Sequence, residues 1–256
     1  MNLPAASAPS RDVGNCDKTL LRGLIIAAIA ATLVAGPATA AFMPPTGLSP
    51  GSQYQILFVT ADTMAGTSGS ESDYNSFVQT EAAPLTALLP NGTTWSAITS
   101  TFDGTSYDNA ANNVDNDPSL PVYNTQGQLL SFNPFYLWAG PLNANTAVQY
   151  DQTGSAVNGF VWTGSVVSGG EPVATTGNAL GQANPTYGES NTGSSAWLDA
   201  GTAPQGSPLH VYGLSSPIAV VPEPATLLLF GTGLLGLALA GYLRRFQVTV
   251  RRSVAP

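Results

Sequence analysis

Acidic and amide side chains crowd one short stretch of the chain, where they could bind a metal ion. Asp103, Asp108, Asp115 and Asp117 alternate there with several asparagines. Calcium takes about six to eight oxygen ligands, which aspartate carboxylates and asparagine carbonyls can supply. The spacing differs from an EF-hand, because no glycine follows Asp117 at the sharp turn and no glutamate closes the loop. Since Asp, Asn, Gly and Pro also build ordinary turns, the sequence favours a solvated loop over a calcium-stabilised one.

The parts needed for most catalytic sites are missing from the middle of the chain. His210 is the single histidine, Cys16 is the single cysteine, and residues 41–221 contain no lysine. Ser-His-Asp, Cys-His, Schiff-base and multi-histidine zinc sites are therefore incomplete or absent. Two carboxylates could still hydrolyse a glycoside, but the sequence singles out no pair. We expect a protein that is not an enzyme, has no cofactor other than the calcium considered above, and uses His210 structurally on a strand.

Positive charge is confined to the two ends of the chain. The seven basic residues are Arg11, Lys18, Arg22, Arg244, Arg245, Arg251 and Arg252. Residues 41–221 carry twelve of the fifteen acidic residues and no lysine or arginine, so no side-chain salt bridge to either can form there. These carboxylates must stay hydrated, accept hydrogen bonds or surround a cation. Nucleic acids and acidic phospholipids are poor partners for such a surface.

The first 40 residues resemble a leader that ends in a secretory signal peptide. Lys18 and Arg22 precede an apolar stretch at 23–34, and Ala38 and Ala40 provide the small residues of a cleavage site. We expect cleavage after Ala40, because this stretch is short for a membrane anchor. The exported protein then has no cysteine and no disulfide.

The other end combines a short motif with an apolar run and a basic pair. Val221, Pro222, Glu223 and Pro224 precede an uncharged stretch at 225–243, which is long enough for a transmembrane helix. Arg244 and Arg245 follow directly and favour a cytoplasmic end, with residues 246–256 as a basic cytoplasmic tail.

This arrangement at 222–245 resembles the PEP-CTERM sorting signal of Gram-negative bacteria. The resemblance implies export across the inner membrane, processing near the Pro-Glu-Pro motif by an exosortase, and delivery to the cell envelope, cell surface or extracellular matrix. It implies the secretion machinery and an exosortase as partners, with extracellular polysaccharide as a further candidate.

Residues 41–221 form the exported body, with enough length for one domain that has its own core. Periodicity predicts a helix at 72–83, capped by Ser70 or Ser72 and stopped by Pro84. Short strands are predicted where aromatic and β-branched residues gather, at 54–60, 94–99 (strand or short helix), 121–123, 159–163, 196–198 and 209–214. The fold class is therefore α+β, a single loop-rich domain with mostly antiparallel short strands and one early helix.

The order of these elements over residues 54–216 is similar to that of C-type-lectin-like and endostatin-like domains. Sugar-binding members place Glu-Pro-Asn and Trp-Asn-Asp around calcium, whereas this chain has Glu171-Pro172-Val173 and Trp197-Leu198-Asp199, and it lacks their disulfides. Two functions follow from the sequence. The first is a non-catalytic surface or matrix protein. The alternative is a carbohydrate-binding, or less favoured carbohydrate-cleaving, domain that uses exposed tryptophans as stacking platforms.

Overall fold

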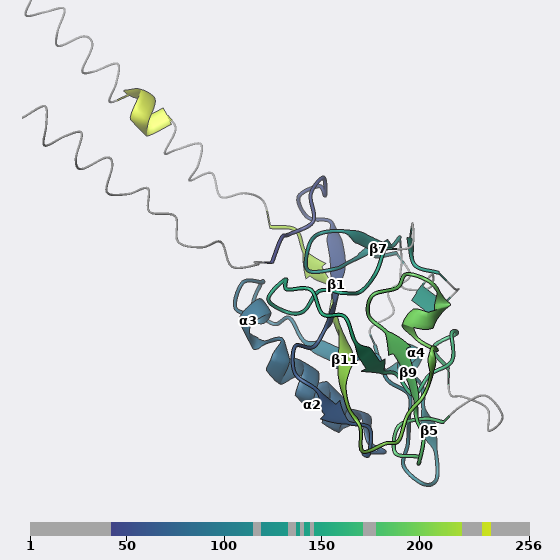
Figure 1. Cartoon of the computed structure of the whole chain (residues 1–256). Helices are drawn as coiled ribbons and strands as arrows, with labels where there is room; N and C mark the ends of the chain where they lie inside the picture. Colours follow the sequence, from purple (N-terminus) through teal and green to yellow (C-terminus); the bar gives the residue numbers. More distant parts are fainter. Residues whose placement is uncertain are drawn as a thin grey trace, which may run out of the picture. The chain divides into compact units, whose positions relative to one another are not determined.

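The computed structural model describes residues 42–114, 119–132, 137–138, 141–143, 146–170, 178–221 and 232–236. The chain divides into two units, Met1–Thr39 and Ala40–Pro256. The first lies outside the described residues, so the fold below is that of the second. It is rich in strands and loops and has few helices (Figure 1).

The described elements are short apart from two strands and one helix. The strands are β1 (Gln53–Val59), β2 (Met64–Ala65), β3 (Trp95–Ala97), β4 (Thr101–Phe102), β5 (Tyr107–Asp108), β6 (Val122–Tyr123), β7 (Leu129–Ser131), β8 (Phe160–Trp162), β9 (Thr186–Glu189), β10 (Gly201–Thr202), β11 (Pro208–Ser215) and β12 (Ile218–Ala219). The helices are α2 (Glu71–Glu81), α3 (Ala83–Thr86), α4 (Ala110–Asn113) and the 3-10 helix η3 (Ser195–Trp197).

One mixed sheet organises the domain around its two longest strands. Its order is β10-β9-β8-β11-β1-β6-β7, with β12 paired to β1 and with β2 and β3 paired to β11. The β1–β6 and β11–β8 pairs are parallel and the other described pairs are antiparallel. A separate hairpin joins β4 to β5. The expected mixture of mostly antiparallel strands with an early helix is thus present.

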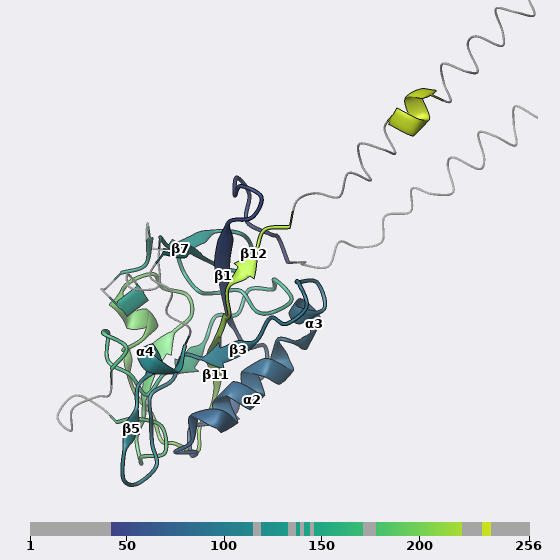
Figure 2. The same cartoon turned by 180° about the vertical axis from the view of Figure 1, so that it is seen from behind.

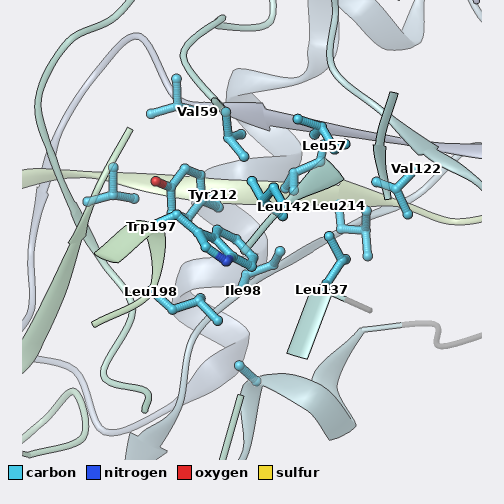
Figure 3. Close-up of a cluster of buried hydrophobic side chains, with 14 of the residues drawn as sticks. Leu57, Val59, Ile98, Val122, Leu137, Leu142, Trp197, Leu198, Tyr212 and Leu214 are labelled. Carbon is cyan, nitrogen blue, oxygen red and sulfur yellow. The ribbon is translucent and has the colours of Figure 1, made fainter. Parts of the chain in front are cut away.

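Alternating side chains of β1 enter two hydrophobic cores on opposite faces of the sheet. Ile56 and Phe58 belong to one core, and Leu57 and Val59 to the other. All four are fully buried, as expected where successive side chains of a central strand point to opposite faces. Figure 3 shows the second core, in which Leu57 and Val59 lie near Tyr212 of β11.

Helix α2 covers the core that contains Ile56 and Phe58, and it packs there on β3 and β11 (Figure 2). Its buried face contains Tyr74 and Val78, one helical turn apart. Two acidic residues, Glu71 and Asp73, lie in its first turn, where the helix dipole favours negative charge. The approach to β11 is close, because a Cβ added at Gly213 would overlap Val78. Gly213 therefore allows the helix to lie directly on the strand.

Several predicted elements are found and two details are wrong. The predicted strand at 196–198 is instead the 3-10 helix η3, whose N-terminus is capped when the Ala196 amide donates to Ser194 Oγ (3.3 Å). Pro84 does not stop the helical segment, because it occupies the first turn of α3, where the missing proline N–H costs nothing. Ser70 is the N-cap residue of α2, although its side chain makes no capping hydrogen bond.

Candidate functional site

The hydrogen bonds described for the body extend to Val220, two residues before the Pro-Glu-Pro motif. The Val220 amide donates to the Ser52 carbonyl (2.8 Å), and the Gly51 amide donates to the Val220 carbonyl (2.9 Å). These bonds extend the pairing of β12 with the start of β1. Val221 is next and is 65% exposed. Pro222, Glu223, Pro224, Arg244 and Arg245 lie outside the described residues.

The first described residues of the domain also pack against it and form a hydrogen bond with it. Phe42 packs against the helix-covered core, and the Met43 amide donates to the Thr125 carbonyl (2.9 Å). Ala38 and Ala40 lie outside the described residues. If cleavage follows Ala40, the mature chain enters the fold within a few residues.

Asp103 is used to close the turn between β4 and β5. Its Oδ1 accepts hydrogen bonds from the amides of Thr105 and Ser106, both at 2.7 Å. These bonds stabilise the carboxylate and lower the pKa of Asp103, the Ser106 amide contributing most. Asp108 lies on β5, across the same hairpin, and Asp115 and Asp117 lie outside the described residues. The geometry of Asp103 is that of an ordinary turn, while the calcium hypothesis for the four aspartates stays a prediction.

Other acidic side chains also obtain hydrogen-bond donors in place of cations. Asp151 Oδ1 accepts from the amides of Thr153 (2.7 Å) and Ser155 (2.9 Å). Glu81 Oε2 accepts from the Asp62 amide and from Gln152 Nε2, both at 3.1 Å. Backbone and side-chain amides therefore take the role that lysine and arginine have in most domains.

Glu71 differs from these acids. Its Oε1 is buried and has no hydrogen-bond partner in the part of the chain that the structure describes. Burial and, to a smaller extent, the nearby charge of Asp108 raise the pKa of Glu71 to about 8. Sequence reasoning missed this residue, because an acidic first helical residue looks like an ordinary dipole partner. Among the described residues, no three carboxylate, imidazole or thiol groups gather closely enough to hold a metal ion.

His210 is bound to the backbone of the neighbouring strand region. Its Nδ1 lies 2.8 Å from the carbonyl oxygen of Thr60, to which the Nδ1–H tautomer donates. The ring also packs on Gly159, where an added Cβ would lie 3.0 Å from the imidazole. These contacts agree with a structural role on β11.

The tryptophans belong mainly to the cores. Trp95, Trp162 and Trp197 are at most 3% exposed, and Trp138 stacks on Trp197 with ring centroids 6.4 Å apart. Trp197 lies inside the cluster drawn in Figure 3. Three of the four expected stacking platforms are thus closed to a sugar, and the exposed aromatic rings in the described part of the chain are Tyr107, Phe132 and Phe160.

Comparison with protein families identifies the segment that follows β12. The family model described as PEP-CTERM protein-sorting motif matches residues 220–245. The chain carries a PEP-CTERM sorting motif. The match begins at Val220, which pairs with Ser52 and Gly51 at the end of β12. PEP-CTERM signals indicate exosortase-dependent sorting, so the protein is exported to the cell envelope or surface of a Gram-negative bacterium, with an exosortase as its processing partner.

The comparisons say less about the residues outside the PEP-CTERM motif. No curated protein matches the chain. The resemblance to C-type-lectin-like domains is not confirmed, and Glu171, Pro172 and Val173 lie outside the described residues. Within the described ranges, no helix is both long and apolar enough to cross a bilayer. Of the predicted span at 225–243, the structure describes 232–236, which is helical.

Proposed function

We propose that the chain is a non-catalytic surface or matrix protein, whose body at 41–221 is delivered outside the inner membrane and separated from its C-terminal signal by an exosortase. The observation that carries the proposal is the PEP-CTERM match at residues 220–245, which starts where the folded domain ends. A sorting signal placed there can be removed with little loss to the fold.

The route requires two membrane signals that stay predictions. The N-terminal signal peptide starts export and is cleaved after Ala40. A helix at 225–243 then holds the protein in the inner membrane, with Arg244 and Arg245 on the cytoplasmic side. The body is acidic and free of lysine and arginine, so neither of these cationic side chains resists its transfer across the membrane.

Two epitope tags on one full-length chain test this route. One tag is inserted between Asn91 and Gly92, in an exposed turn where Gly92 has no neighbour within 4 Å of an added Cβ. The second tag follows Pro256. Cell fractionation should find the first tag in the envelope or the medium without the second, because processing separates them. Co-migration of both tags in the inner membrane contradicts processing, and a first tag in the cytosol contradicts export.

A matched pair of variants separates the motif from its surroundings. Glu223→Ala changes the centre of the motif and should leave both tags on one membrane-bound chain. Val221→Ala changes the exposed neighbouring side chain and should be processed like the wild type. Equal processing of the two variants would mean that the motif is not what the exosortase reads.

Carbohydrate binding is the alternative, with different expected results. A glycan array and a reducing-sugar assay on the exported protein distinguish binding, cleavage and neither. We expect neither, because three of the four tryptophans are buried and the carboxylates of Asp103, Asp151 and Glu81 accept hydrogen bonds from the protein itself. Binding on the array would favour the alternative, and release of reducing sugar would favour a carboxylate hydrolase.

A further inference from the structure

Asparagine precedes glycine twice in the chain, at Asn91-Gly92 and at Asn158-Gly159. An asparagine in this position can lose its side-chain amide when the amide nitrogen of the next residue attacks its Cγ. Glycine favours the attack, because it has no Cβ to hinder the approach. The nitrogen must come within about 3–3.5 Å of Cγ, which a nitrogen held in another hydrogen bond does not readily do. Both asparagines are exposed, so the surroundings of each glycine amide distinguish the two dipeptides.

The Gly92 amide lies in an open turn between α3 and β3. The turn is closed at its ends, where the Thr93 amide (3.4 Å) and the Thr93 hydroxyl (2.9 Å) donate to the carbonyl of Pro90. Gly92 is exposed and has a φ of 95°, and an added Cβ would meet no atom within 4 Å beyond its neighbours in the chain. No described residue accepts a hydrogen bond from the Gly92 amide. Its nitrogen is therefore available to attack Asn91.

The Gly159 amide, by contrast, is held at the start of β8. It donates to Ser190 Oγ (3.0 Å), and the Ser190 amide donates to the Gly159 carbonyl (3.0 Å). Ser190 is fully buried, and its hydroxyl donates in turn to the carbonyl of Val157 (2.7 Å). The His210 ring packs on Gly159 from the other strand, 3.0 Å from an added Cβ. Attack on Asn158 would require these contacts to break.

A related dipeptide, Asp103-Gly104, is protected in another way. An aspartate before a glycine can undergo the same ring closure, but its ionised carboxylate is a poor target for a nucleophile. Asp103 Oδ1 accepts hydrogen bonds from the amides of Thr105 and Ser106, both at 2.7 Å, and these bonds stabilise the ionised form. Asn91 is therefore the position at which the described structure leaves this reaction unhindered.

We propose that the fold makes Asn91, and not Asn158, a site of spontaneous deamidation, with water as the co-reactant. The Gly92 nitrogen bonds to Asn91 Cγ, the bond from Cγ to Nδ2 breaks, and Nδ2 leaves as ammonia with the proton of the Gly92 amide. Water then opens the resulting cyclic imide. Attack at Cγ gives aspartate, and attack at the main-chain carbonyl gives isoaspartate, in which the chain continues through the side chain. No oxidant or reductant is needed.

The modification changes both the charge and the backbone of the body. Each product adds a carboxylate to a region without lysine or arginine, so neither of these can neutralise it. Isoaspartate also adds a methylene group to the main chain inside the turn that the Pro90–Thr93 bonds close. The imide forms without an enzyme and the released ammonia is lost, so older molecules carry more of the acidic form than newly made ones.

The test incubates the untagged full chain, purified in detergent, at pH 8 and 37 °C and samples it over several weeks. Pepsin digestion at acidic pH is used, because residues 41–221 contain no lysine or arginine for trypsin to cut. Mass spectrometry follows the replacement of NH by O at each asparagine. Asn91 should be lost at least about tenfold faster than Asn158. In concentrated urea the two rates should agree within about threefold, because Ser190 and His210 no longer hold Gly159.

Three variants separate the steps of the argument. Gly92→Ala should slow the loss of Asn91 at least about tenfold, because the new Cβ hinders the attack. Ser190→Ala removes the acceptor of the Gly159 amide, so it should speed the loss of Asn158 and leave the rate at Asn91 unchanged. Asn91→Asp is the standard for the product, and aged wild type should move to its position in isoelectric focusing. Melting curves of all three verify that each variant is folded.

Three results would overturn the proposal. The first is equal loss of Asn91 and Asn158 from the folded protein. The second is an intact Asn91 in the folded protein after a time in which urea-unfolded chains have lost it. The third is the same preference for Asn91 in urea as in the folded protein, which would show that the neighbouring sequence selects the site without the fold.

Discussion

Replacement of Glu71 by glutamine should make the stability of the domain less dependent on pH. Burial of the Glu71 carboxyl, helped by the charge of Asp108, raises the pKa of this group from 4.5 to about 8 in the folded protein. Between these two values the folded state keeps a proton that the unfolded state releases. The free energy of unfolding contributed by Glu71 is therefore fully present below pH 4.5 and is lost as pH rises through about 8.

The size of the effect follows from the partial burial of the side chain. A shift of one pKa unit corresponds to about 1.4 kcal/mol, but Glu71 is only half-buried and solvent screens its charge. After this discount we expect a loss of about 1–2 kcal/mol between pH 5 and pH 9. Asp108 on β5 is the charged group that raises the pKa of Glu71, and Asp73 is the other acidic residue in the first turn of α2.

Urea unfolding at pH 5, 7 and 9, with EDTA present, measures this contribution. The difference in stability between wild type and Glu71→Gln should shift in favour of the variant by about 1–2 kcal/mol as pH rises, or roughly 2–8 °C in melting temperature for a domain of this size. Asp73→Asn is the control for losing one charge from the same turn, and its pH profile should follow the wild type. Parallel profiles of wild type and Glu71→Gln would refute the reasoning.

Three substitutions test the packing and hydrogen bonding of the body by urea unfolding. Gly213→Ala should destabilise by about 2–3 kcal/mol, because the new methyl group would overlap Val78, whereas Gly206→Ala meets no atom within 4 Å and should change little. Asp151→Ala should cost about 2 kcal/mol, because a nearly buried turn loses the acceptor of its amides, and Asp151→Asn should recover most of this loss. Trp162→Phe should cost about 1–2 kcal/mol, because its Nε1–H donates to a backbone carbonyl at 3.0 Å. Equal stabilities within either matched pair would contradict the corresponding argument.

The elements that could be predicted from the sequence are those with a local apolar pattern. The strand at 54–60 and the helix at 72–83 were expected, and β1 and α2 lie within two residues of these bounds. Strand β9, Thr-Tyr-Gly-Glu, has no such pattern, because Gly188 occupies a buried position against the backbone of Trp197. The parallel pairing of β11 with β8 joins segments far apart in the sequence, which local patterns do not encode.

The candidate site also has one part that the sequence predicts and one part that it does not. The sorting motif could be recognised because its residues are contiguous and its chemistry depends on order along the chain. Glu71 could not, because its raised pKa depends first on burial in the folded domain and then on the charge of Asp108, which lies on β5 later in the chain. The sequence did contain one relevant signal, the absence of lysine and arginine from residues 41–221, which leaves the carboxylates of the body without a lysine or arginine of the body for ion pairing. The missing lysines and arginines predict that carboxylates lack ion-pair partners, but they do not show which carboxylate is buried.

The hydrogen bonds of Val220 bring the folded body to within two residues of the Pro-Glu-Pro motif. One residue, Val221, separates the hydrogen-bonded Val220 from Pro222, whereas a protease that works on an extended peptide needs several free residues on each side of its cut. An exosortase that cuts near this motif must therefore either accept a bulky globular neighbour beside its entrance or wait until the two-residue strand β12 frays from β1. Insertion of a Gly-Ser spacer after Val221 would relieve that steric limit. The rate of processing then depends on how readily β12 separates from β1 as well as on the exosortase itself.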